Sequence, residues 1–182
     1  MNRQNKACSI AITAFFAALT AICSQIQIPL PYIPINLALL AVHLSGALLG
    51  SRRAASAQIV YLLLGLIGLP VFAGFGAGPG ILFEKTGGYI LGYVLCALID
   101  GRNKVTGVSV PSVPVMMLHM LAGTFVCYFF GTIWFMRLTR ISLSVSLSYC
   151  VIPFIPGDII KIILAAILAR RLTPQLQRLG LC

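Results

Sequence analysis

An acid and a base lie three residues apart near the end of the chain, in the stretch PFIPGDIIK at residues 153–161. Its prolines and glycine break the backbone, and the apolar run at residues 162–169 predicts that a helix begins here. Side chains three apart share one helical face, so Asp158 and Lys161 are neighbours. The lysine could pair with an anionic ligand group, and the carboxylate could accept hydrogen bonds from ligand N–H groups.

Hydrocarbon side chains surround this pair. Of 182 residues, 59% are hydrophobic and 9% are charged, and the mean hydropathy is +1.01. Soluble domains carry roughly 25% charged residues, so the composition predicts an integral membrane protein. Ionisable groups within a membrane are costly and usually serve a function. The alternative interpretation is that Asp158 and Lys161 only neutralise each other.

The net charge of +10 comes from 13 lysines and arginines against three acidic residues. These basic residues stand in short segments between apolar runs, with no basic helix face and no interleaved aromatics, so nucleic-acid binding is not expected. Contact with membrane lipid and the setting of topology explain their placement. With both termini in the cytoplasm, nine lie on the cytoplasmic side, three lie outside and Lys161 lies within a span, which predicts this orientation.

Six apolar runs predict six membrane-spanning helices in one compact, all-α, multi-pass domain covering residues 1–182. Continuous runs of this length do not fit the alternating pattern of a β-barrel. Residues 136–148 predict a loop or a surface helix, and residues 105–112 a weakly structured connection. The expected spans are residues 8–26, 35–50, 54–72, 86–100, 113–135 and 155–171.

Three segments rich in proline or glycine lie on the outer face in this topology, at residues 27–34, 73–85 and 153–157. Non-helical backbone at membrane depth is tolerated where it lines a cavity or is covered by protein. The sequence therefore predicts an outward-facing pocket at the starts of the second, fourth and sixth spans. Its expected lining is Asn36, Phe75, Phe83, Lys85, Thr86, Tyr89, Phe154, Asp158 and Lys161.

The residue types in this predicted pocket favour a small, mostly apolar acid. Helix N-termini and two lysines suit a carboxylate, and the aromatics suit a flat or sulfur-containing ring. Other interpretations stay open: Tyr89 and Phe154 also fit interfacial aromatics, and Lys85 could form a solvated pair with Glu84. Thr86 is a candidate N-cap.

The first apolar run carries two pairs of alanines four residues apart, Ala14 with Ala18 and Ala17 with Ala21. Small residues at this spacing let another helix approach closely. Internal packing and a docking face for a partner subunit both explain them.

Neither the cysteines nor the histidines have the spacing of a metal site, and no metal or cofactor is expected. The six cysteines form no CxxC motif and mostly lie in apolar runs, where they suit small packing residues. His43 and His119 stand in separate runs without neighbouring carboxylates and are expected to be hydrogen-bonded within the bundle.

Taken together, these segments resemble BioY, the family of biotin-specific S components of energy-coupling factor (ECF) transporters. The resemblance rests on GLPVFAG at residues 68–74, TGGY at residues 86–89 and PFIPGDIIK at residues 153–161. The proline-rich loop and LLGSRR at residues 48–53 agree with it. It covers nearly the whole chain.

The resemblance implies six helices in a bacterial plasma membrane that capture biotin from outside and deliver it inward. A transmembrane coupling subunit, docked on the alanine face of the first helix, and a pair of ATP-binding subunits would drive the cycle. Asp158 and Lys161 match the family's polar ligand contacts, with residues 86–89 and the preceding loop closing the site. The family often has Gln shortly after the proline loop where this chain has Ala38, and Asn36 is the candidate replacement.

Two other function classes fit the sequence less well. An intramembrane enzyme using Asp158, Asp100 or Glu84 needs paired carboxylates, but the predicted topology puts Asp100 and Asp158 on opposite sides of the membrane. A structural or sensor subunit would not need outer loops rich in glycine and proline. An S component for a different small carboxylate vitamin stays open, because the residues alone define only a small acid.

Overall fold

The computed structural model describes residues 3–30, 32–103 and 111–178, and seven α-helices make up most of this described part. The predicted all-α class is thereby confirmed, while the predicted connection at residues 105–112 lies mostly outside the described residues. The helices are α1 (Arg3–Gln25), α2 (Ala38–Leu49), α3 (Ser51–Leu66), α4 (Gly87–Asp100), α5 (Val113–Thr139), α6 (Leu143–Cys150) and α7 (Ile155–Arg178).

Few of the described helices are both long enough and apolar enough to cross a membrane alone. The part of α1 from Ala7 to Gln25 and the whole of α5 meet the length and hydropathy expected of a span. Helices α6 and α7 meet it together, across a bend of 51°. Helices α2 and α4 are apolar but have only 12 and 14 residues. Among the described helices, two or three are therefore full-length spans.

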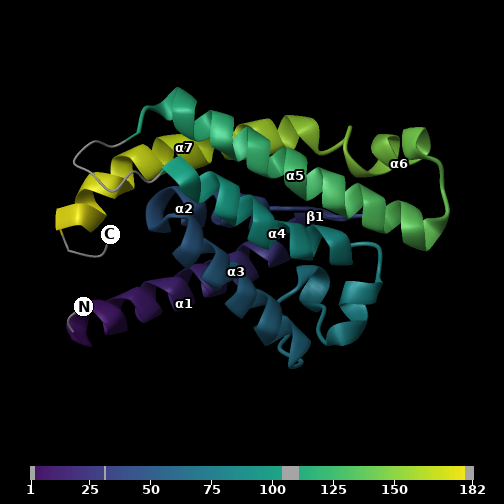
Figure 1. Cartoon of the computed structure of the whole chain (residues 1–182). Coiled ribbons are helices and arrows are strands. Elements are labelled where there is room, and N and C mark those ends of the chain that lie inside the picture. Colours follow the sequence, from purple (N-terminus) through teal and green to yellow (C-terminus); the bar gives the residue numbers. More distant parts are fainter. Residues whose placement is uncertain (1–2, 31, 104–110, 179–182) are drawn as a thin grey trace.

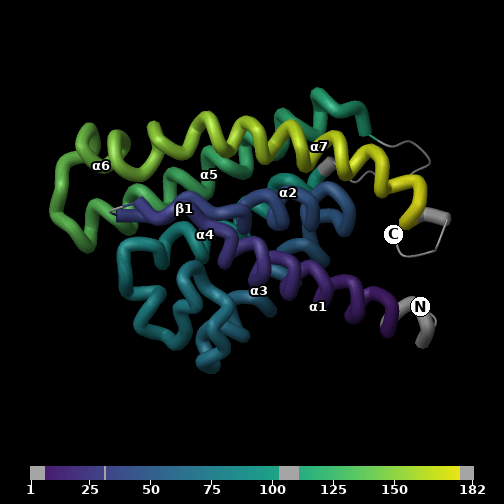
Figure 2. Tube along the Cα trace, turned by 180° about the vertical axis from the view of Figure 1, so that it is seen from behind, coloured from purple at the N-terminus to yellow at the C-terminus, as the bar shows by residue number. Residues whose placement is uncertain are grey.

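Most of the non-helical segments gather at one end of the bundle, which we call the loop end, whereas the first turns of α1 and the last turns of α7 lie at the opposite end (Figures 1 and 2). This grouping agrees with the predicted clustering of the proline- and glycine-rich segments. The loop end holds strands β1 (Gln27–Ile28) and β2 (Ile35–Asn36), the 3-10 turns η1 (Ala73–Phe75) and η2 (Pro79–Phe83), and the bend between α6 and α7.

The second and third helices are shorter than predicted because neighbouring segments take up their ends. Residues 35–36 belong to the antiparallel pair, in which Gln27 lies opposite Asn36, so α2 begins only at Ala38. At the end of α3, Gly68 has a φ of +102°, a left-handed conformation that favours glycine and turns the chain out of the helix. Helix α3 therefore ends at Leu66 instead of continuing to residue 72.

Glycines let α4 and α5 lie close together. A Cβ at Gly92 would come within 3.1 Å of the Cα of Cys127. A Cβ at Gly88 would overlap the side chain of Trp134, and a Cβ at Gly131 would overlap the ring of Tyr89. Small residues at such an interface allow two helix backbones to approach. This packing fixes the middle of α5 against the start of α4.

The two alanine pairs of α1 have different surroundings. Ala17 is fully buried beside Tyr61 and Phe72, with Ala21 packed at the edge of the same cluster. Ala14 and Ala18 are exposed. Internal packing, one of the two explanations left open, therefore accounts for Ala17, whereas Ala14 and Ala18 are the alanines most accessible to a partner.

Candidate ligand-binding site

A cavity of about 260 Å³ lies at the loop end, between the hairpin, the starts of α4 and α7, and the middle of α5. Its walls are mainly aromatic and aliphatic, with a few polar groups at defined positions. This composition is typical of sites for small molecules, in which apolar walls supply burial and the polar groups fix orientation.

Asp158 and Lys161 form a buried ion pair in the wall of this cavity. The Lys161 Nζ donates to Asp158 Oδ1 at 2.7 Å, and the two residues are 4% and 5% exposed. They meet because α7 begins after the bend, where the backbone N–H of Asp158 donates to the Phe154 carbonyl at 2.9 Å in the first helical turn. The pair thus lies in the first turns of the helix, as the spacing predicted.

Tyr128 completes this polar group and was missed by the sequence analysis. Its hydroxyl donates to Asp158 Oδ2, so the two carboxylate oxygens are held by different donors. Tyr128 lies in the middle of α5, 30 residues before its partner. No local spacing marks it in the sequence, because only the packing of α5 beside α7 brings the two together.

Four further predicted residues line the same cavity: Asn36, Thr86, Tyr89 and Phe154. The Asn36 Oδ1 accepts a hydrogen bond from the Ala38 backbone N–H at 3.1 Å, which anchors the start of α2. The Tyr89 hydroxyl lies 3.4 Å from both Thr132 Oγ1 and the Cys150 carbonyl oxygen. Thr86 occupies the N-cap position of α4, although its side chain makes no capping hydrogen bond.

Three predicted residues lie outside the lining of this cavity. Phe75 and Phe83 are 71% and 72% exposed. Lys85 is exposed as well, with its ammonium 5.2 Å from the centre of the Tyr32 ring. Lys85 and Phe83 line a second, more open hollow that shares Tyr32, Glu84 and Thr86 with the main cavity. A ligand role for Phe75, Phe83 and Lys85 stays a prediction.

The sequence analysis also missed most of the aromatic wall, which includes Tyr32, Tyr61, Phe72 and Tyr93. Tyr93 could have been found, because it follows Tyr89 by four residues and shares its face of α4. Phe72 is 1% exposed and stacks edge to face on Tyr61 with ring centroids 5.5 Å apart. Tyr61 belongs to α3, so only the tertiary fold brings it to the pocket.

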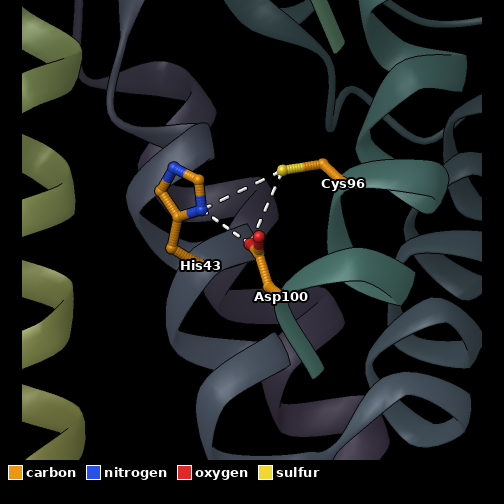
Figure 3. A group of neighbouring side chains, drawn as sticks. All are labelled: His43, Cys96 and Asp100. Carbon is orange, nitrogen blue, oxygen red and sulfur yellow. Dashed lines mark hydrogen bonds and ion pairs between the residues drawn. The ribbon is translucent and has the colours of Figure 1, made fainter. Parts of the chain in front are cut away.

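A second polar group lies deep in the bundle, away from the cavity (Figure 3). The His43 Nδ1 of α2 lies 2.6 Å from Asp100 Oδ2 of α4, and the Cys96 Sγ lies 3.5 Å from the same oxygen. Asp100 ends the predicted span at residues 86–100, and in the structure it is the last residue of α4 and is 2% exposed. His43 is hydrogen-bonded as predicted, but the expectation that it lacks a carboxylate neighbour is wrong. His119 contacts the Val115 carbonyl of its own helix at 3.0 Å.

The fold and the cavity define a helical membrane protein with a largely apolar cavity near one end of its bundle. The BioY family model matches residues 1–178, and the chain belongs to the BioY family.

Relatives and a solved structure agree with this membership. The chain is 34% identical to a probable biotin transporter of Pyrococcus horikoshii, over 92% of this chain and 97% of that one. It is 32% identical to a biotin transporter of Lactococcus lactis, over 91% and 90%. The crystal structure of an S-component for biotin from an ECF-type ABC transporter superposes with a TM-score of 0.84 and 28% identity, covering 94% of both chains.

Proposed function

We propose that this chain is the biotin-binding S component of an ECF transporter and that it binds biotin in the cavity at the loop end. The observation that carries the proposal is the buried Asp158–Lys161 pair in the wall of that cavity. The chain belongs to a family of transporters and is not an enzyme. Tyr128, which donates a hydrogen bond to Asp158, and the aromatic wall supply the remaining contacts for a compact, largely apolar ligand.

The ion pair has hydrogen-bonding capacity left for a ligand. An ammonium has three N–H donors, and Asp158 takes one of those of Lys161. Each carboxylate oxygen can accept a second hydrogen bond beside those from Lys161 and Tyr128. An acceptor and a donor therefore stand side by side in the cavity wall.

Biotin offers the complementary arrangement in its ureido group, where an N–H lies beside a C=O. We assign the ureido end to Asp158 and Lys161, because a ligand carboxylate at this place would be repelled by Asp158. The biotin carboxylate then points toward Thr86 and Lys85, in a hollow where the Lys85 ammonium balances the charge of Glu84. This assignment revises the sequence expectation, in which Lys161 met the carboxylate.

The remaining features of the proposal concern the membrane and the partners. All six predicted spans cross the plasma membrane with both termini in the cytoplasm, and the short helices α2 and α4 are completed by the non-helical segments at the loop end. A transmembrane coupling subunit docks on the Ala14–Ala18 face of α1, and a pair of ATP-binding subunits supplies energy. The exposure of these two alanines supports the docking site.

Titration of purified, tag-free protein with biotin, its methyl ester and other carboxylate vitamins tests the function. We expect biotin to bind most tightly and its ester to bind somewhat more weakly. Tighter binding of another vitamin would replace biotin as the ligand. Loss of all affinity for the ester would make the carboxylate the main polar contact and overturn the assignment of the ureido group to that role.

A matched pair of variants tests the docking face. Ala18→Leu should abolish transport in cells that also make the coupling module, while biotin binding by the purified variant stays unchanged, because a leucine there blocks the approach of a partner helix. Ala18→Ser, which keeps a small residue at the same position, is the control. Normal transport by Ala18→Leu would exclude this face.

A further inference from the structure

The inner polar group of His43, Cys96 and Asp100 is independent of the biotin site, and its hydrogen bonds determine which ring nitrogen of His43 carries a proton. The Thr124 hydroxyl donates to the Met120 carbonyl at 2.8 Å, so its oxygen must act as the acceptor toward His43 Nε2 at 3.3 Å. The Nε2 of His43 therefore carries a hydrogen. In the neutral ring, Nδ1 is then a bare acceptor.

This bare nitrogen faces a carboxylate oxygen. His43 Nδ1 lies 2.6 Å from Asp100 Oδ2, and both residues are buried, at 0% and 2% exposure. Two lone pairs cannot face each other at this distance without a positive centre between them. A proton can occupy that place, and so can a metal ion.

Cys96 provides a third donor aimed at the same point (Figure 3). Its Sγ lies 3.5 Å from Asp100 Oδ2 and 3.9 Å from His43 Nδ1. In a tetrahedral zinc site, with Zn–S about 2.3 Å and Zn–N or Zn–O about 2.0 Å, such donor pairs stand about 3.5 Å apart. The two distances from sulfur are close to that value. The nitrogen–oxygen pair would have to open by about 0.7 Å to reach the corresponding separation of about 3.3 Å.

Asp100 also has an unused donor atom. Its Oδ1 is buried against Gly123 and has no hydrogen-bond partner among the residues that the structure describes. A buried carboxylate oxygen without a partner is destabilising. A cation held by the other oxygen, Oδ2, would neutralise the carboxylate and so lower the cost of burying Oδ1 without a partner. A divalent ion bound to one thiolate and one carboxylate is also electrically neutral, which suits a site deep in an apolar bundle.

We propose that His43, Cys96 and Asp100 bind one zinc ion that fastens α2 to α4. Nitrogen, sulfur and oxygen donors together suit this ion. The hydrogen bond between His43 Nε2 and Thr124 supplies the outer contact that orients a metal-bound imidazole. The spacing of the cysteines and histidines did not predict this site, because His43 and Asp100 belong to different helices and are 57 residues apart in the sequence.

Wild-type protein, purified without an affinity tag and dialysed against a chelator, provides the first test. After reloading with zinc and gel filtration, we expect about one zinc per chain by mass spectrometry. Cobalt in place of zinc should give the ultraviolet charge-transfer band of a cobalt–thiolate bond. Absence of retained zinc and of this band would show that a proton alone joins His43 and Asp100, and would overturn the proposal.

Variants then locate the ion. Cys96→Ser should lose the cobalt–thiolate band and bind zinc at least tenfold more weakly, whereas Cys150→Ala, which changes another fully buried cysteine, should keep both. Zinc should raise the melting temperature of the wild type but not that of Cys96→Ser. Retention of the band in Cys96→Ser would place the ion at a different cysteine. If Cys96→Ser does not fold, X-ray absorption spectroscopy of the zinc-loaded wild type replaces this test. A spectrum without a zinc–sulfur contact would overturn the proposal.

Discussion

Two buried acid–base pairs lie at different depths of this bundle and are built in different ways. Asp158 and Lys161 belong to one helix and are three residues apart, near the loop end. His43 and Asp100 belong to different helices, and the backbone at Gly46 and Gly123 packs directly against Asp100. A Cβ at Gly46 would overlap the side chain of Asp100.

The two pairs differ in whether their polar atoms remain accessible to a ligand. A pair within one helical turn forms without help from the tertiary fold, so one side of it can face a cavity. A pair between two helices is made by packing, and its atoms are enclosed by the elements that it joins. Burial of charge alone therefore does not mark a ligand site. The outer pair is placed to hold a solute, and the inner pair to hold helices together.

The largest expected effect comes from Lys161→Ala. It removes the cation beside a buried carboxylate and also one of the proposed ureido contacts. Breaking such a buried pair costs roughly 3 kcal/mol. Biotin affinity should therefore fall by at least tenfold, and by about a hundredfold if most of that free energy is lost from binding. Isothermal titration of the purified variant measures this. Wild-type affinity would remove the pair from the binding site.

The inner pair should respond in stability instead. Asp100→Ala leaves the His43 Nδ1 without its partner and should lower the free energy of unfolding by about 3 kcal/mol, with biotin affinity changed less than twofold. Thermal unfolding in detergent with a chelator present reports the first quantity. Adding His43→Leu to Asp100→Ala should recover part of the loss, because the imidazole is then no longer buried without its partner. A large loss of biotin affinity in Asp100→Ala would erase the distinction between the two pairs.

Tyr128→Phe tests whether the third member of the outer group positions Asp158. Loss of one hydrogen bond to a charged group is worth about 1.5 kcal/mol, which corresponds to a roughly tenfold weaker binding of biotin. The matched control is Tyr149→Phe in α6, whose ring is 42% exposed and which should bind biotin as the wild type does. Equal biotin affinities for the two variants would show that the Tyr128 hydroxyl does not position Asp158 for binding.

The smallest effect is expected for Lys85→Ala. This lysine is exposed over the Tyr32 ring, and water screens its charge. Surface ion pairs are worth less than about 1 kcal/mol, so biotin affinity should fall less than about fivefold. Methyl-esterified biotin should show no difference between this variant and the wild type. A loss as large as that of Lys161→Ala would move the main polar contact to the hollow outside the cavity.

Much of the outer site could be read from the sequence because its signals are local. The helix start at Asp158 follows from two prolines and a glycine, and the neighbouring position of Lys161 follows from helical geometry. Asn36, Thr86 and Tyr89 were found for a similar reason, since each stands where a helix begins beside a loop rich in proline or glycine. The exposure of Phe75 and Lys85 was not foreseen, because loop paths depend on packing.

The inner group shows the limit of local signals. Asp100 stands before Gly101 and Arg102, a sequence that is typical of a polar turn, yet its carboxylate is enclosed by His43, Cys96 and the backbone at Gly123. The two alanine pairs of α1 likewise have equal spacing, and only the position of α3 decides that Ala17 is buried while Ala18 is exposed.

The sequence by itself determined the membrane class, the helical content, the clustering of proline and glycine at one end, and the acid and base of the outer site. Hydropathy and spacing act over one or two helical turns, so these features need no knowledge of the fold. The tertiary structure alone decided which tyrosine holds Asp158, which alanines are buried, and that His43 meets Asp100. Each of these depends on how two helices distant in the chain pack side by side, and glycines at the contacts of α4 with α2 and α5 permit that approach.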